Sequence, residues 1–201
     1  MNLSLLPKVS EPVLTSLLLA TGFLGALTLL FLVRMVCRWF AVAPSVTVYH
    51  SPKGGCADAI LRELKQARRE VLVQAYSFTS KPIAEALIEV KKRGARVEIV
   101  LDQSNEEEPY SQLPLLVGEG LAPLIDAHHA IAHNKVMIVD RRTLITGSFN
   151  FTHQAEHENA ENLLVIKGHP ELIASYRQSF TAHKGHSQPP GKQAGNSSGP
   201  R

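Results

Sequence analysis

An uncharged apolar run near the N-terminus divides this 201-residue chain into two parts. No charged residue occurs from Pro12 to Val33, and a run of this length suffices for a helix of about 20 residues to cross a bilayer. We therefore predict one transmembrane helix over residues 13–33, with residues 1–12 as its flank and residues 34–44 as a juxtamembrane linker. Any folded domain must be built from the residues after this linker.

A cleaved signal peptide is the alternative for the same run, because Ala41-Val42-Ala43 resembles a small-x-small cleavage site. An uncleaved anchor is favoured, since Lys8 is the only basic residue before the run and the run itself is too long for a signal peptide. Arg34 and Arg38 come after the run, so the positive-inside tendency predicts a cytoplasmic domain. Cleavage would instead make the domain periplasmic or secreted.

Charge and cysteine content restrict the function classes. The formal net charge is +3, but basic and acidic residues nearly balance outside residues 1–43, so composition does not indicate the concentrated basic face of a nucleic-acid binder. The two cysteines, Cys37 and Cys56, show no Cys-x-x-Cys spacing. We interpret both as free thiols and expect no structural zinc site.

Strand-like and helix-like patterns alternate after Pro44. The expected strands cover residues 45–50, 70–78, 96–101 and 162–167, with a hairpin within 133–152. The expected helices cover residues 57–69, 82–93, 111–119 and 170–183. This alternation predicts an α/β layered domain over residues 45–186 with parallel pairs in its sheet. We expect the acidic loop 102–109 to be solvated and the tail 187–201 to be disordered.

The hairpin brings polar residues onto one patch. Val136–Val139 is an apolar, β-branched run, so His133 and Lys135 should lie on one face of a strand. Folding the two apolar runs into an antiparallel pair about Arg141-Arg142 sets Lys135 opposite Ser148 and His133 opposite Asn150. A one-residue slip would scatter these side chains.

This patch suits a phosphodiester. A histidine can attack phosphorus, while Lys135 and Asn150 can stabilise charge on the nonbridging oxygens without a metal. Strand parity turns Asp140 away from His133, so we assign it a supporting, structural role. An isolated histidine is more often an ordinary surface or core residue, and Ser and Asn are common in turns. The complete pattern, however, is rare by chance.

His133-x-Lys135-x4-Asp140 resembles the HKD motif of the phospholipase D superfamily, and residues 147–152 resemble the segment that comes after the motif there. The similarity covers residues 46–183. It is greatest to single-motif bacterial endonucleases of the Nuc type and weaker to the mitochondrial cardiolipin hydrolase group. The resemblance implies a phospholipase D-like layered sandwich, a mixed β-sheet flanked by helices, preceded here by the transmembrane helix.

The same resemblance assigns the site residues. It implies that His133 becomes phosphorylated, that Lys135, Ser148 and Asn150 hold the phosphate, and that Glu161 orients the histidine. The catalytic set is then His133, Lys135, Glu161 and Asp140, with no cofactor and no metal.

The mechanism needs a second histidine to protonate the leaving oxygen. The other histidines near the motif in sequence lack its pattern and are expected on the surface; they are His128, His129, His153 and His157. We therefore predict a homodimer with two His133 side chains facing across the two-fold axis.

Three functions remain open. The leading prediction is a sequence-nonspecific endonuclease acting on DNA or RNA, because the resemblance is greatest to the Nuc-type proteins. The second is a phospholipase D or cardiolipin hydrolase acting on the membrane that holds the chain, which the anchor favours. The third, a non-catalytic lipid or nucleic-acid binding module, ranks last because the motif is intact.

Overall fold

The computed structural model describes residues 10–39 and 43–191, and the chain separates into two compact units that divide between Ala41 and Val42. In the first unit, α1 (Glu11–Trp39) contains a stretch, Glu11–Met35, that is long and apolar enough to cross a membrane, with a mean hydropathy of 2.3. Such a helix near the N-terminus is either an anchor or a signal sequence. The cleavage-like site lies largely outside the described residues.

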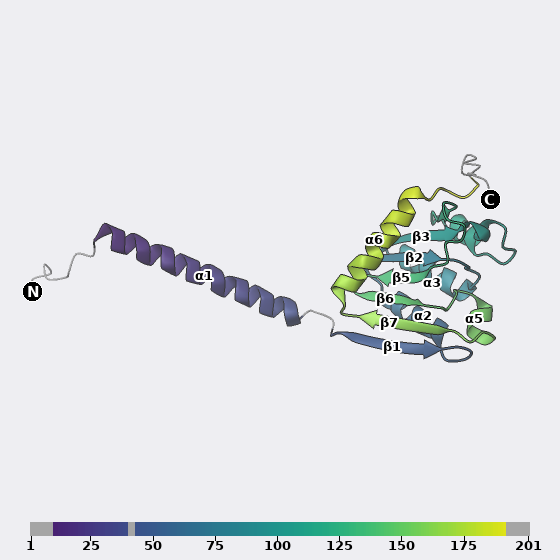
Figure 1. The fold of residues 1–201 in the computed structure, drawn as a ribbon, viewed down its shortest axis with the longest axis horizontal. Helices are drawn as coiled ribbons and strands as arrows, with labels where there is room; N and C mark the ends of the chain where they lie inside the picture. The colour runs from purple at the N-terminus through teal and green to yellow at the C-terminus, as the bar shows by residue number, and fades with distance from the viewer. Residues whose placement is uncertain (1–9, 40–42, 192–201) are drawn as a thin grey trace, which may run out of the picture. The chain divides into compact units, whose positions relative to one another are not determined.

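The second unit contains a sheet of seven strands in the order β1-β7-β6-β5-β2-β3-β4 (Figure 1). The strands are β1 (Ser45–His50), β2 (Glu70–Ala75), β3 (Arg96–Asp102), β4 (Leu124–Asp126), β5 (Lys135–Val139), β6 (Thr143–Gly147) and β7 (Asn162–Lys167). Neighbours among β2, β3 and β4 run parallel, and the other pairs are antiparallel. The predicted mixed sheet is confirmed.

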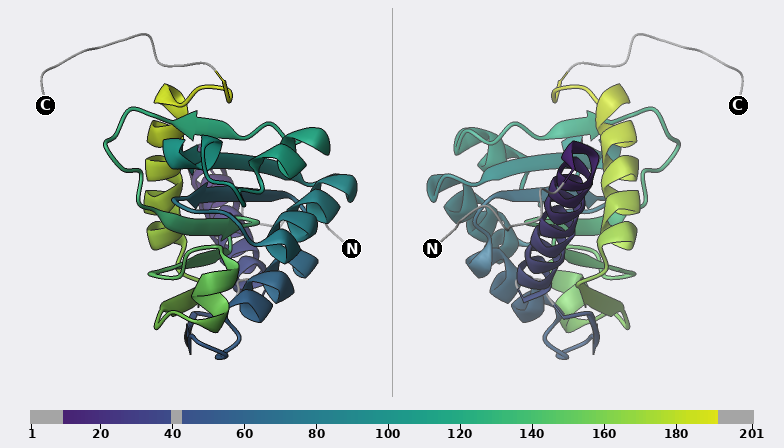
Figure 2. Two further views of the ribbon diagram at one scale, coloured as in Figure 1. Left: turned by 90° about the vertical axis from the view of Figure 1, so that its right-hand side faces the viewer. Right: turned by 90° about the vertical axis from the view of Figure 1, so that its left-hand side faces the viewer.

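Helices cover both faces of the sheet, so the domain has three layers (Figure 2). The longer helices are α2 (Cys56–Gln66), α3 (Lys81–Lys92) and α6 (Pro170–His186). The short helical elements are α4 (Leu113–Gly118), α5 (His153–His157) and a 3-10 turn, η2 (Gln103–Glu106). The larger core includes Ile60 of α2, Leu87 of α3 and Met137 of the sheet, and the smaller core packs Phe180 of α6 against Leu72 and Ile138. Every residue of β2 is buried, because this central strand is covered on both faces.

The connections differ from the expectation in two places. The acidic loop is mostly exposed, as expected, but Asn105 within it is 2% exposed, and Asp102 at the end of β3 is 6% exposed. The expected disorder of the tail does not extend to residues 187–191, where Gln188 forms an antiparallel bridge with Ile125. Residues 192–201 lie outside the described part of the chain.

The hairpin register differs by one residue from the predicted one. Val136 pairs with Thr146, and Val139 pairs with Thr143, so three residues rather than two lie between the last paired positions. Asp140 and Arg141 adopt left-handed backbone conformations, with φ of 52° and 59°, and Arg142 donates its N–H to the Val139 carbonyl at 3.0 Å. The predicted pairing of Lys135 with Ser148 is therefore wrong, because the loop contains one more residue than a tight turn.

Candidate active site

All the predicted site residues except Asp140 nevertheless gather at one edge of the sheet. Ala75 at the end of β2 pairs with Lys135 at the start of β5, and Gly147 at the end of β6 pairs with Leu163 near the start of β7. Residues just before β5 and β7 and just after β2 and β6 consequently meet at the edge formed by the carboxyl ends of the parallel strands. Ligands commonly bind at this edge of open α/β sheets.

Lys135 is the buried cation of this edge. Its side chain is 6% exposed, and Nζ donates to the His133 carbonyl at 3.0 Å and lies 5.0 Å from the centroid of the Tyr76 ring. Burial lowers the pKa of Lys135, while the negative charges of Glu161 and Asp102 act in the opposite direction. No ion pair within residues 43–191 includes Lys135, so its charge is available to an anionic substrate.

His133 lies beside Lys135 but is exposed to solvent. Its imidazole packs against the ring of Tyr76, with the ring centroids 4.6 Å apart. The preceding residue, Ala132, donates its backbone N–H to the Asp102 carboxylate at 2.6 Å, which fixes the chain immediately before the histidine. The imidazole is thus positioned by its neighbours while it remains accessible to a substrate.

Ser148 and Asn150 come after β6 at the same edge. Ser148 Oγ accepts hydrogen bonds from the backbone N–H of Asn162 at 3.0 Å and from its side-chain amide at 3.3 Å, so Ser148 links β6 to β7. Asn150 Oδ1 is buried and has no hydrogen-bond partner in the described part of the chain. Because the oxygen and nitrogen of an asparagine amide exchange places by a flip, this unpaired position can also present an N–H to an anion.

Glu161 is held just before β7. Its backbone N–H donates to Ser51 Oγ at 3.2 Å, and its Oε1 accepts from the side chain of Asn159 at 3.2 Å. Its negative charge raises the pKa of Lys135, in opposition to the effect of burial. No hydrogen bond joins Glu161 to the His133 imidazole among the described residues, so its role in orienting the histidine stays a prediction.

Asp140 lies at the opposite end of β5 from Lys135. Its carboxylate accepts hydrogen bonds from three successive backbone N–H groups, those of Arg68, Arg69 and Glu70, at 2.7–3.0 Å. These hydrogen bonds agree with a structural role for Asp140, and its place in the catalytic set stays a prediction. Its role is to fix the start of β2 against the hairpin.

Tyr76 and Asp102 are site neighbours that sequence reasoning missed. Tyr76 comes directly after β2, and Asp102 is the last residue of β3. A polar residue at the carboxyl end of a buried parallel strand is itself a signal for this edge of the sheet, and it could have indicated both residues. The Tyr76 ring packs against His133 and lies 5.0 Å from Lys135 Nζ. The negative charge of Asp102 raises the pKa of Lys135.

An open cleft of about 690 Å3 is lined by Thr79, Gln112, Thr152 and neighbouring polar residues. Its lining includes none of the five residues assigned to catalysis and phosphate binding at the edge. Within the described residues, the side chains suited to metal binding form a separate cluster at Asp126.

The family is established by fold, site and comparison together. Residues 60–184 match the family model described as "Cardiolipin synthase, PLD-like domain". The chain belongs to the phospholipase D superfamily and is a phosphodiesterase of that class.

Individual relatives refine the comparison. The chain is 39% identical to a protein named phospholipase D from Rickettsia typhi over 140 residues, which cover 70% of this chain and 68% of the relative. It is 34% identical to a mitochondrial cardiolipin hydrolase from Chlamydomonas reinhardtii, covering 65% of this chain and 57% of that protein. Among solved structures, Nuc from Salmonella typhimurium, described as a phospholipase D family member, is 36% identical with a TM-score of 0.70, covering 73% of this chain and 98% of Nuc.

Proposed function

We propose that this phosphodiesterase hydrolyses membrane phospholipids in the manner of a phospholipase D, with α1 as its anchor. The observation that carries this proposal is the covalent connection of an apolar helix to the domain, since β1 begins at Ser45 shortly after α1 ends at Trp39. An anchored domain encounters lipid at a high effective concentration. Arg34 and Arg38 after the apolar run favour the cytoplasmic side for the domain.

The chemistry proceeds in two displacements. The imidazole of His133 attacks phosphorus, a P–N bond forms, and the P–O bond to the headgroup alcohol breaks as that oxygen takes a proton from a second histidine. Water, deprotonated by the second histidine, then attacks phosphorus, breaks the P–N bond and releases phosphatidate. Lys135 and Asn150 stabilise the charge on the nonbridging oxygens in both steps.

The second histidine comes from another copy of the chain in this proposal. Among the other histidines of the described domain, His129, His183 and His186 surround Asp126, and His153 packs against His157 with ring centroids 4.1 Å apart. The exposure of His133 fits a homodimer in which the two imidazoles face each other. Full activity of a strictly monomeric protein would contradict this arrangement.

Endonuclease activity is the second candidate, and the sequence alone placed it first. The likeness to Nuc over nearly the whole of that chain supports it. The proteins named phospholipase D, which match this chain over 69–70% of its length, favour the lipid substrate instead. A non-catalytic binding module stays last because His133, Lys135, Ser148, Asn150 and Glu161 are all present at one edge.

The discriminating experiment uses the full chain reconstituted in vesicles of phosphatidylcholine and cardiolipin, with labelled single-stranded DNA, duplex DNA and RNA offered in parallel. We expect release of phosphatidate that is not stimulated by added Mg2+. The His133→Ala variant should lose at least about 1,000-fold of this activity because the nucleophile is gone. His157→Ala is the matched control, an exposed histidine outside the site, and should retain activity. Cleavage of nucleic acid with intact lipid would overturn the lipid proposal.

A further inference from the structure

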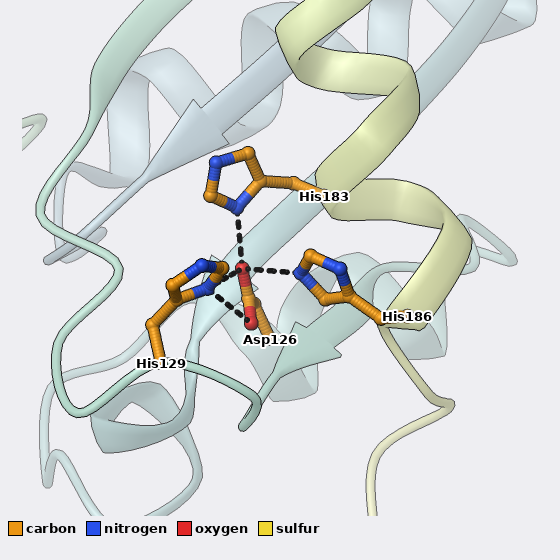
Figure 3. Close-up of side chains that lie close together, drawn as sticks. All are labelled: Asp126, His129, His183 and His186. Atoms are coloured by element: carbon orange, nitrogen blue, oxygen red, sulfur yellow. Dashed lines mark hydrogen bonds and ion pairs between the residues drawn. The ribbon is translucent and has the colours of Figure 1, made fainter.

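Four side chains with metal-binding chemistry converge on the side of the domain where α6 ends (Figure 3). Asp126 is the last residue of β4, His129 lies in the connection after it, and His183 and His186 lie in the last turns of α6. One ligand atom from each residue can be chosen so that all four atoms lie within 4.8 Å of one another. His183 and His186 are three residues apart on a helix and therefore present their rings on the same face.

The distances approach those of a tetrahedral site. Asp126 Oδ2 lies 2.6 Å from His183 Nδ1, 3.2 Å from His186 Nε2 and 3.2 Å from His129 Nδ1. Ligand atoms on a tetrahedral Zn2+ with bonds of about 2.0–2.1 Å lie about 3.3 Å apart. The three separations from Oδ2 are near or below this value, and every pair of the four ligand atoms lies within 4.8 Å.

The charge of the cluster also calls for a cation. The Asp126 side chain is fully buried, and its ion-pair partners in the described part of the chain are histidines, with no lysine or arginine beside it. Burial of a carboxylate is costly without a positive charge beside it, and at this position the charge comes from a protonated imidazole or from a bound cation. A divalent ion would supply it and would use the same four atoms.

A neighbouring contact orients the carboxylate. The backbone N–H of His128 donates to Asp126 Oδ1 at 3.1 Å, and this oxygen also lies 3.3 Å from His129 Nδ1, while Oδ2 contacts all three histidines. Such outer contacts fix the direction of a metal-binding carboxylate. The three imidazoles are partly exposed, at 42%, 18% and 29% for His129, His183 and His186, which leaves a path for an ion from solvent.

We propose that Asp126, His129, His183 and His186 form a site for a divalent transition-metal ion, best suited to Zn2+. Three imidazoles and one carboxylate match the ligand types of Zn2+, whereas Ca2+ and Mg2+ prefer oxygen ligands. Because the protein supplies all four ligands, the site is structural and not hydrolytic. This inference goes beyond the proposed function and revises the expectation of no zinc, which rested on cysteine spacing alone.

The site would tie α6 to the segment that carries the nucleophile. Residues 127–134 connect β4 to β5, and His129 and His133 both lie in this connection. Asp102 holds the same connection at Ala132. By binding His129 together with His183 and His186, the metal ion would hold this connection to the end of α6 and so restrain it at a second position before His133.

The test is a Zn2+ titration of the full chain in detergent, purified without a polyhistidine tag and stripped with a chelator that is then removed. We expect one Zn2+ per chain by elemental analysis and a higher thermal midpoint with Zn2+, whereas millimolar Mg2+ has no such effect. His129→Ala and His183→Ala should each weaken Zn2+ affinity by at least about 100-fold, since each removes a ligand. His157→Ala, a histidine outside the cluster, should bind like the unmodified protein.

A spectroscopic measurement covers the case in which a variant fails to fold. Co2+ added to the stripped unmodified chain should give the intense visible absorption of tetrahedral coordination, and one equivalent of Zn2+ should remove it. Absence of stoichiometric Zn2+ binding to the unmodified chain would overturn the proposal and leave Asp126 as a hydrogen-bonded centre. Unchanged affinity in both ligand variants would overturn it as well.

Discussion

The carboxylate of Asp102 accepts a hydrogen bond from the backbone N–H of Ala132, 30 residues further along the chain, at 2.6 Å. The same carboxylate accepts from the backbone N–H and the hydroxyl of Ser104. It therefore joins the turn after β3 to the residue that precedes His133.

Replacing Asp102 should loosen this junction. In the wild type, both carboxylate oxygens of Asp102 accept hydrogen bonds, whereas in Asp102→Asn one of the two positions becomes an NH2 group that cannot accept. We expect the free energy of unfolding to fall by about 2 kcal/mol, as for the loss of other charge-assisted hydrogen bonds. Amide hydrogen exchange at residues 131–134 should accelerate. Ser104→Ala is the control, because it removes one hydroxyl and keeps the bond to Ala132. Equal exchange in the two variants would contradict the role given to Asp102.

The same variant should change the titration of Lys135. Burial lowers the pKa of Lys135 below the ordinary value of 10.5, and the charge of Asp102 opposes this shift. Phosphate binding needs the protonated amine, so substrate affinity should fall with rising pH at a lower pH than free lysine would predict, and lower still in Asp102→Asn. The pH dependence of KM measures this. If KM rose at the same alkaline pH in the unmodified protein and in Asp102→Asn, the effect of the Asp102 charge on the pKa of Lys135 would be contradicted.

Glu70 should contribute to stability in a pH-dependent manner. It is buried, and although burial opposes its ionisation, hydrogen bonds from Arg96, Arg141 and Arg177 bring its pKa below the ordinary value of 4.5. A lowered folded-state pKa contributes stability that is fully present above pH 4.5 and is lost as the pH falls through the folded-state value.

We expect Glu70→Gln to lower the free energy of unfolding by about 2 kcal/mol at pH 7, with a smaller difference from the unmodified protein below pH 4.5. Urea denaturation across this pH range measures the difference. Glu85→Gln is the control, since Glu85 and Lys81 form an exposed pair at 3.7 Å. A constant difference between the Glu70 variant and the unmodified protein at all pH values would refute the linkage.

Cys56 should be unreactive in the folded protein. Burial, reinforced by the charges of Glu156 and Glu161, raises the pKa of its thiol from 9.0 to about 11. The thiolate population at pH 8 is then about 100-fold smaller than in an unfolded chain. Alkylation of the Cys56 peptide, followed by mass spectrometry separately from Cys37, should be slow until urea is added. Rapid labelling under native conditions would contradict the buried environment.

Gly147 should not tolerate a side chain. Its φ is +154°, and a Cβ built there would lie 2.3 Å from the carbonyl oxygen of Asn162 on β7. We expect Gly147→Ala to lower the free energy of unfolding by about 2 kcal/mol or more. Gly118→Ala in α4 meets nothing within 4 Å and should be neutral or slightly stabilising. Thermal denaturation compares the two variants, and similar midpoints would refute the steric argument.

Long apolar strands could be predicted from the sequence, and short paired ones could not. The prediction for β7 agrees with the structure, and β2 begins where expected but ends three residues earlier than predicted. β4 has only three residues, and its pairing with β3 is what makes it a strand. No periodicity marks such an element. Its detection requires knowledge of the tertiary fold.

For the candidate site too, contacts within one segment could be predicted from the sequence, and contacts that depend on tertiary packing could not. His133 and Lys135 could be placed together from strand parity, because they belong to one segment. The hairpin register could not, since it depends on whether two or three residues form the loop at Arg141. The cluster around Asp126 joins residues 57 positions apart through the packing of α6, which spacing along the sequence does not reveal.

The pairing of β1 with β7 affects how the protein is made. β1 is the first strand of the domain to leave the ribosome, yet its one partner among the described strands is β7, and the contact between Ser51 and Glu161 closes a separation of 110 residues. At translation rates of about 5–20 residues per second, this interval lasts roughly 5–20 s. During that time α1 is already synthesised while the edge of β1 has no partner. The nascent domain therefore completes its sheet late in synthesis, and factors that shield unpaired strand edges would act in this interval.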